Sequence, residues 1–170
     1  MSLIISDTRE KKNQHILQYF NQHNVNYVIR KLDYGDYQDV DNPYLSIDRK
    51  RNIAELAKNC TSDHERFRRE LERVKKAGAT LVVLVEQNRY KDRDKWIKVE
   101  RIEDLLLWSS PHTKVRGEKV FRVLSSWMYK YPLRVEFCDK RSTGKRITEI
   151  IYKGDRHERG EKELHRLQRH

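Results

Sequence analysis

Two aspartates in the stretch 35–50, GDYQDVDNPYLSIDRK, are spaced so that their carboxylates can meet. Residues 39–43 have the composition of a turn, because short polar side chains that bond their own backbone are followed by a proline. Residues 44–48 alternate as a strand does, so the stretch predicts a hairpin. The middle of that turn is equidistant in sequence from Asp36 and Asp48, which predicts that the two carboxylates lie opposite each other.

A basic pair follows the second aspartate directly. Because side chains alternate along a strand, Lys50 shares a face with Asp48, whereas Arg49 points to the other face. Paired carboxylates can hold a divalent cation, and an ammonium group beside them can orient water and screen a phosphate. This combination is suited to metal-assisted hydrolysis of a phosphodiester. An acidic turn on a solvated hairpin would show the same local pattern, so the surrounding elements must decide between the two.

Further acids follow the ends of two predicted buried strands. Residues 3–5 form a continuous apolar run, and Asp7 and Glu10 come shortly after it. Residues 81–85 form the clearest apolar run of the chain, and Glu86 follows at once. In open α/β sheets ligands bind at the carboxyl ends of the strands, so we expect these acids at one edge of a sheet. The alternative for Asp7 and Glu10 is a structural role at the start of a helix.

The other elements are predicted from periodicity, caps and turn residues. A helix at 62–76 begins with the pattern of a capping box and ends before Gly78. The remaining predictions are a helix at 13–23, a strand at 25–32, a short helix at 53–60, a polar loop at 88–95, a sheet extension at 96–101, helices at 102–108 and 115–129, a strand at 133–138, a turn at 142–145 and a closing helix at 147–152.

The composition indicates one basic globular domain. With 170 residues, 36% of them hydrophobic, the chain can bury one core, expected over 1–153, before a polar tail at 154–170 that is helical or disordered. The net charge of +11 favours a polyanionic partner, and DNA is the first candidate. Cys60 and Cys138 are interpreted as reduced thiols, and no signal peptide is visible, so a cytoplasmic protein is expected.

Basic side chains that could contact the DNA backbone gather mainly on the helix at 62–76. A run of charges on a helix is usually only a solvated face, but here the cations outnumber the acids. The candidates for DNA contact are Arg9, Arg66, Arg69, Arg73 and Lys76.

The order of the motifs resembles one known family. Along the chain run DTRE at 7–10, GDY at 35–37, IDRK at 47–50, RF at 66–67 and the strand that ends in Glu86. This order resembles the XPF family of structure-specific endonucleases. The resemblance implies an α/β, restriction-endonuclease-like fold of the PD-(D/E)XK type, with a central mixed sheet flanked by helices. It also implies Mg²⁺- or Mn²⁺-dependent cleavage of DNA near branch points.

The resemblance also implies roles for single residues. By matching position, the metal ligands would be Asp7, Asp36 and Asp48, with Lys50 as the catalytic lysine and Glu10 and Arg49 as active-site support. Two positions depart from the family pattern. Asp48 stands where the family has glutamate, and the acid expected at position 54 falls one residue later, at Glu55. The role of Glu55 is therefore left open.

Three functions are compatible with these observations. The first is a structure-specific endonuclease for flaps, forks or Holliday junctions in recombination, replication or repair. The second is a non-catalytic DNA-binding module of a recombination or replication complex, and the third is a recombination nuclease that is not selective for branches. No helix-hairpin-helix signature is present, and the compact chain is similar to nucleases of phages and prophages, which would act in a bacterial host cell. A homodimer through the helices at 102–108 and 115–129 is a further expectation.

Overall fold

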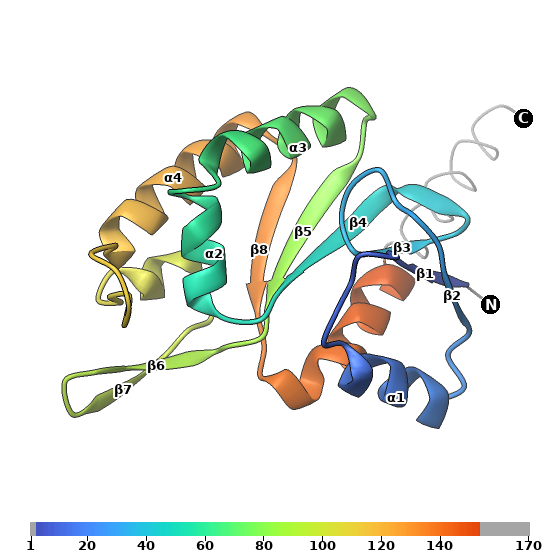
Figure 1. Ribbon diagram of the computed structural model, residues 1–170, viewed down its shortest axis with the longest axis horizontal. Helices are drawn as coiled ribbons and strands as arrows, with labels where there is room; N and C mark the ends of the chain where they lie inside the picture. The colour runs from blue at the N-terminus through green and yellow to red at the C-terminus, as the bar shows by residue number, and fades with distance from the viewer. Residues whose placement is uncertain (1–2, 154–170) are drawn as a thin grey trace, which may run out of the picture.

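The protein is organised around a six-stranded mixed sheet with helices on both faces (Figure 1). The computed structural model describes residues 3–153, and the tail expected at 154–170 lies outside the described residues. The strands are β1 Ile4–Ser6, β2 Tyr27–Ile29, β3 Tyr37–Asp39, β4 Asn42–Lys50, β5 Thr80–Val85 and β8 Leu133–Phe137. Their order across the sheet is β2-β1-β3-β4-β5-β8. The predicted α/β class with a central mixed sheet is confirmed.

The strand directions bring the acidic segments to one edge of the sheet. β1 is parallel to β2 and antiparallel to β3, β3 is antiparallel to β4, and β4, β5 and β8 run parallel. Consequently β1, β4 and β5 end at the edge where β3 begins. The chain after β5 stays beside the end of β4, because the backbone N–H of Glu86 donates to the carbonyl of Lys50 at 2.8 Å.

The predicted hairpin is formed by β3 and β4. Its register pairs Tyr37 with Ile47, so Asp36 and Asp48 are the next residues along and lie opposite each other. The backbone N–H of Asp36 donates to the carbonyl of Ile47 at 2.7 Å, which continues the pairing to this position. The register shifts after Gln38, so β4 begins at residue 42, two residues earlier than the alternation predicts.

Two hydrophobic cores lie on the two faces of the sheet. Helix α1 Gln14–Gln22 and a helix over 143–153 cover one face, while α2 Ile53–Asn59, α3 His64–Lys76 and α4 Gly117–Lys130 cover the other (Figure 1). Along β5, Leu81, Val83 and Val85 face the core under α2, α3 and α4. Val82 and Leu84 face the core under α1 and the helix over 143–153. This two-sided burial explains the continuous apolar run of β5. No helix within residues 3–153 is long and apolar enough to cross a membrane.

Residues 88–101 differ from their prediction. The expected polar loop and sheet extension are instead a separate two-stranded hairpin of β6 Arg89–Asp92 and β7 Lys95–Lys98. The prediction was wrong because Asp92 to Lys95 form a tight turn in which Arg93 has a φ of 54°. A single apolar run beside a polar segment does not reveal such a turn.

Three local predictions near helix ends were also wrong. Asp63, not Ser62, precedes α3, and its side chain makes no capping bond. The helix expected at 102–108 is a short 3₁₀ helix, η1 Ile102–Leu105. The expected turn at 142–145 is helical, since η2 Lys140–Ser142 leads directly into the helix 143–153. Gly144 serves packing there, because a Cβ at this position would lie 2.7 Å from the side chain of Tyr19.

Candidate active site

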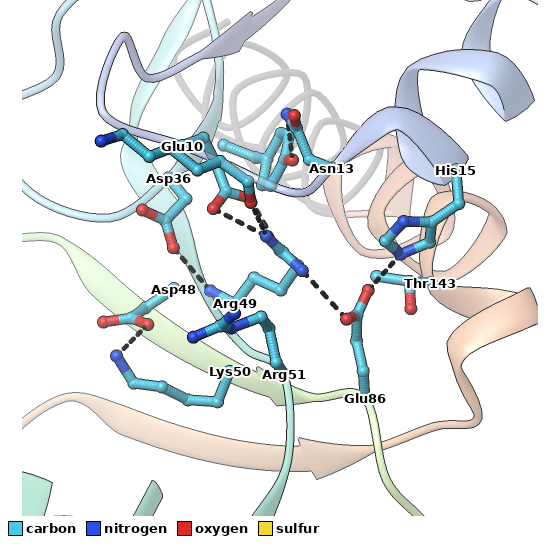
Figure 2. A network of polar contacts seen from close by, with 12 residues as sticks. Glu10, Asn13, His15, Asp36, Asp48, Arg49, Lys50, Arg51, Glu86 and Thr143 are labelled. Atoms are coloured by element: carbon cyan, nitrogen blue, oxygen red, sulfur yellow. Dashed lines mark hydrogen bonds and ion pairs between the residues drawn. The ribbon is translucent and has the colours of Figure 1, made fainter. Parts of the chain in front are cut away.

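Asp36, Asp48 and Lys50 converge at the sheet edge (Figure 2). The Nζ of Lys50 lies 2.7 Å from Oδ1 of Asp48 and 5.6 Å from the ring centroid of Phe67 on α3. Asp36 accepts a hydrogen bond of 2.8 Å from the backbone N–H of Arg49 through Oδ2. The strand alternation therefore places two carboxylates and one amine on the same face, as the sequence predicts.

A groove of about 300 Å³ opens over these residues, and we call it the acidic groove. Its charged lining includes six acids and five basic residues. They are Glu10, Asp33, Asp36, Asp48, Glu55 and Glu70, with Arg9, Arg49, Lys50, Arg66 and Arg73.

Glu70 is one of the groove residues that the sequence did not predict, together with Asp33 and Asn59. Its Oε1 accepts a hydrogen bond of 3.0 Å from the backbone N–H of Gly35, and the residue is half-buried. Gly35 has a φ of 73°, and a Cβ there would lie 2.0 Å from Oγ of Ser46, so the GD motif needs glycine to reach this position. The sequence indicates the position of Glu70 only through its spacing: it follows Arg66 by four residues, so the two share one face of the predicted helix.

Arg49, next to Asp48 on β4, takes part in a buried ion network that extends from the groove (Figure 2). Its Nε and one terminal nitrogen donate to the two carboxylate oxygens of Glu10 at 2.7 and 2.9 Å. The other terminal nitrogen donates to Glu86 at 2.9 Å, and Glu86 contacts Nε2 of His15 at 2.5 Å. Glu10 and Arg49 therefore tie the segment after β1 and the end of β5 to the strand that carries Asp48 and Lys50.

Asp7 has a structural environment of its own. Its carboxylate is 2% exposed and accepts bonds from the backbone and side chain of Arg9 and from the backbone N–H of Leu32, the last at 2.7 Å. Burial alone would raise the pKa of this carboxyl, but the bonds to Arg9 and Leu32 hold the pKa below its usual range. Asp7 does not line the acidic groove. The carboxylate of Asp7 is therefore bonded to Arg9 and Leu32 and does not line the groove together with Asp36 and Asp48.

Three of the five predicted DNA contacts, Arg9, Arg66 and Arg73, line the groove. Arg66 and Arg73 line it together with Glu70, at helical spacing along one side of α3. Arg69 and Lys76 are exposed on the same helix. The side chain of Arg9 is 65% exposed next to Asp7. Arg9, Arg66 and Arg73 therefore edge the acidic groove with positive charge, and Arg69 and Lys76 add exposed cations to the same helix α3.

Glu55 takes part in a local contact at the start of α2. Its carboxylate lies 3.0 Å from Nε of Arg51, and its backbone N–H donates to the side chain of the helix cap, Asn52, at 2.8 Å. Glu55 also lines the acidic groove, on the side of α2. The structure therefore places it at the rim, with an ion-pair partner of its own.

Burial and mutual repulsion disfavour the ionised form of the acids in the groove. Burial raises the pKa of Asp36 well above its usual range, and the nearby Asp48 and Glu10 raise it further. Burial and Asp48 likewise raise the pKa of Glu70. Burial alone would lower the pKa of Lys50, but the contact with Asp48 outweighs it, so Lys50 is protonated at neutral pH. Without a bound cation, the groove therefore favours the protonated forms of Asp36 and Glu70.

This charge arrangement predicts how pH changes the stability of the metal-free protein. Since the pKa values of Asp36 and Glu70 are raised on folding, the folded state binds more protons than the unfolded state near neutral pH. Stability should therefore increase as the pH falls from neutral towards about 5, where Asp7, with its lowered pKa, is still ionised.

Thermal unfolding at several pH values without divalent ions measures this effect. A gain of about 1 kcal/mol would raise the Tm by about 2–4 °C in a domain of this size. An Asp36→Asn variant should have a higher Tm at neutral pH and a flatter pH profile. A wild-type Tm that falls steadily from pH 8 to pH 5 would contradict the prediction.

The carboxylates of the groove could hold Mg²⁺ or Mn²⁺ as a pair of ligands. Carboxylate oxygens are the ligands that these hard cations prefer, and Mg²⁺ is commonly held by one or two carboxylates with water and substrate phosphate completing its shell. Within residues 3–153 no three His, Cys, Asp or Glu side chains are grouped closely enough to hold a metal ion by themselves. The paired Asp36 and Asp48 fit the two-carboxylate arrangement.

The fold and the groove together define a class of protein. A mixed sheet with an acidic groove and a lysine at its strand ends is the architecture of restriction-endonuclease-like nuclease domains. The ERCC4 domain family matches residues 6–149. The chain therefore belongs to the ERCC4 domain family, and the predicted resemblance to XPF is confirmed.

Solved structures agree with this assignment at the level of the fold. XPF from Aeropyrum pernix matches with a TM-score of 0.64 and 15% identity, over 89% of this chain and 61% of that chain. XPF from Aeropyrum pernix in complex with DNA matches with a TM-score of 0.63 and 14% identity, over 92% of this chain and 66% of that chain. This chain thus spans less than two thirds of either one. No match was found among curated protein sequences.

Proposed function

We propose that this protein is a metal-dependent, structure-specific endonuclease that hydrolyses phosphodiesters at branched DNA. The observation that carries the proposal is the convergence of Asp36, Asp48 and Lys50 in a groove edged by exposed basic side chains. The sheet positions the acids to bind a cation, and Arg66 and Arg73 lie where a phosphate backbone would pass. We also propose that the protein acts in recombination, replication or repair, and that it is active as a homodimer.

Each residue of the groove has a defined task in this proposal. Asp36 and Asp48 would hold Mg²⁺ or Mn²⁺, and Glu70, beside them, would bind water of its coordination shell. When bound, the cation supplies a Lewis acid that polarises the phosphate and favours ionisation of a water molecule. Lys50 is protonated, so it would donate a hydrogen bond to a phosphate oxygen and offset the charge that develops on it.

Glu10 and Arg49 have a positioning task. Their paired hydrogen bonds fix β4 against the segment that follows β1. Because Asp48 and Lys50 flank Arg49 on the same strand, a fixed Arg49 keeps both of them in place. Asp7, through Arg9 and Leu32, would hold the loops on the other side of the groove.

Cleavage of a panel of labelled substrates tests the function. The panel contains a flap, a fork, a Holliday junction and a linear duplex of the same length, each with Mg²⁺, Mn²⁺, Ca²⁺ or EDTA. We expect cutting next to the branch with Mg²⁺ or Mn²⁺ only, and at least tenfold slower cutting of the linear duplex. Binding of all substrates without cutting in Mg²⁺ or Mn²⁺ would identify a non-catalytic DNA-binding module instead. Equal cutting of branched and linear DNA would identify a nuclease without branch selectivity.

A further inference from the structure

The β6–β7 hairpin presents a basic and aromatic face that the groove does not use. Its register pairs Arg89 with Lys98 and Lys91 with Trp96, so these four side chains share one face of the ribbon. All four residues are exposed, and Trp96 is 60% exposed. A large exposed aromatic residue among three cations is an unusual surface, because tryptophan is normally well covered in a folded domain.

The opposite face of the hairpin anchors it to the body of the protein. Tyr90 is 5% exposed, its hydroxyl donates to the carbonyl of Asp104 at 2.6 Å, and Ile97 packs against the core on that side of the sheet. The ribbon therefore has a fixed orientation, with Trp96 on the face that points away from the core. The contrast between the two faces shows that the exposure of Trp96 is a consequence of the strand register.

The cations on the outer face hold the indole in place. The guanidinium of Arg89 lies 4.8 Å from the ring centroid of Trp96, and Nζ of Lys91 lies 5.8 Å from it. Both distances are within the range of cation–π contacts. A ring held in this way loses less conformational entropy when a flat partner stacks on it. Its neighbours also supply positive charge for an adjacent phosphate.

The base of the hairpin lies beside the candidate active site. The backbone N–H of Glu86 donates to the carbonyl of Lys50, and the side chain of Gln87 accepts a bond of 2.9 Å from the backbone N–H of Ile53. From there the ribbon extends away from the main sheet (Figure 1). Strands of four residues reach roughly 13 Å. A DNA strand that leaves the acidic groove along this ribbon would therefore pass Trp96.

We propose that the outer face of the β6–β7 hairpin binds a single-stranded arm of DNA at the branch, with an unpaired base stacked on Trp96 and its phosphates against Arg89, Lys91 and Lys98. The inference rests on the proposed function and adds the element that would distinguish branched from linear DNA. Stacking requires a base released from the duplex, whereas phosphate contacts do not. Trp96 would therefore favour forked DNA, while the three cations would bind any DNA.

Binding of the full chain to two oligonucleotides tests this inference without cleavage. One probe is a fork with a single-stranded arm, the other is a fully paired duplex of equal length, and both are measured in EDTA by fluorescence anisotropy. Trp96→Ala should weaken fork binding about tenfold and duplex binding less than twofold, and Trp96→Phe should retain most of the fork affinity. The Nζ of Lys98 lies 2.8 Å from Glu100, an exposed partner that it would exchange for a phosphate. Lys98→Ala should therefore weaken binding of both probes equally and reduce the salt dependence of binding by about the amount of one phosphate contact.

A second exposed aromatic residue provides the matched control. Tyr129 at the end of α4 is 93% exposed, so Tyr129→Ala should change neither affinity. Equal weakening of fork and duplex by Trp96→Ala, or no change in either, would overturn the proposal, and the second result would favour a protein partner for this face. If the wild-type protein binds the fork through Trp96 but cuts nothing with Mg²⁺, the proposed function fails while the role of the hairpin stands.

Discussion

Replacing Asp36 or Asp48 by asparagine should reduce Mg²⁺-dependent cleavage by about 10³-fold or more, while folding and DNA binding persist. Loss of one carboxylate removes a ligand of the cation, and the Lewis-acid contribution of such an ion is several kcal/mol. Asparagine has the same shape as aspartate, and its side-chain oxygen can still accept the bond that Asp36 receives from Arg49. Cleavage rates of the flap substrate and its affinity in EDTA measure the two effects separately.

The stability of these variants distinguishes a functional carboxylate from a structural one. Because burial and like charges raise the pKa of Asp36, its ionised form is disfavoured by the fold, so Asp36→Asn should unfold at a higher temperature than the wild type. Asp33→Asn is the matched control, since Asp33 is an exposed acid on the rim of the same groove. Full activity of Asp36→Asn or of Asp48→Asn would remove the substituted residue from the proposed site.

Replacing Arg49 by alanine should destabilise the protein by about 3–5 kcal/mol. The guanidinium is 2% exposed and bonds both Glu10 and Glu86, so its loss leaves two carboxylates at buried positions without their partner. Arg51→Ala is the matched control on the same segment. Its side chain is 49% exposed in an ion pair with Glu55, and such a pair contributes about 0–1 kcal/mol. Urea unfolding without divalent ions measures both losses.

A combined variant tests the physical cause of this loss. If the cost comes from unpaired buried charge, changing Glu10 and Glu86 to glutamine in the Arg49→Ala background should restore part of the stability. Cleavage should stay low in the combined variant, because β4 would still lack the bonds that fix Asp48 and Lys50. An Arg49→Ala protein as stable as the wild type would show that the network does not hold this strand.

The local sequence determined the centre of the site because its geometry depends on short-range rules. Side chains alternate along a strand, so Asp48 and Lys50 share a face as counted. The turn itself lies at residues 40–41 instead of around Asn42, and the register shift after Gln38 compensates for this difference, so Asp36 still lies opposite Asp48. The two apolar strands that precede Asp7 and Glu86 were visible for the same reason, since burial on both faces leaves a continuous apolar run. Motif order then indicated the family, which the match to the ERCC4 domain confirms.

The tertiary structure decided which of the acids face one another. The carboxylate of Asp7 accepts a hydrogen bond from the backbone N–H of Leu32. Glu70 is held at the groove by a hydrogen bond from the backbone N–H of Gly35. Both contacts join residues at least 25 positions apart, so no periodicity encodes them. The exposure of Trp96 likewise depends on which face of the β6–β7 hairpin packs on the core. Sequence spacing specifies the neighbours along one element, whereas contacts between elements depend on how the whole chain packs.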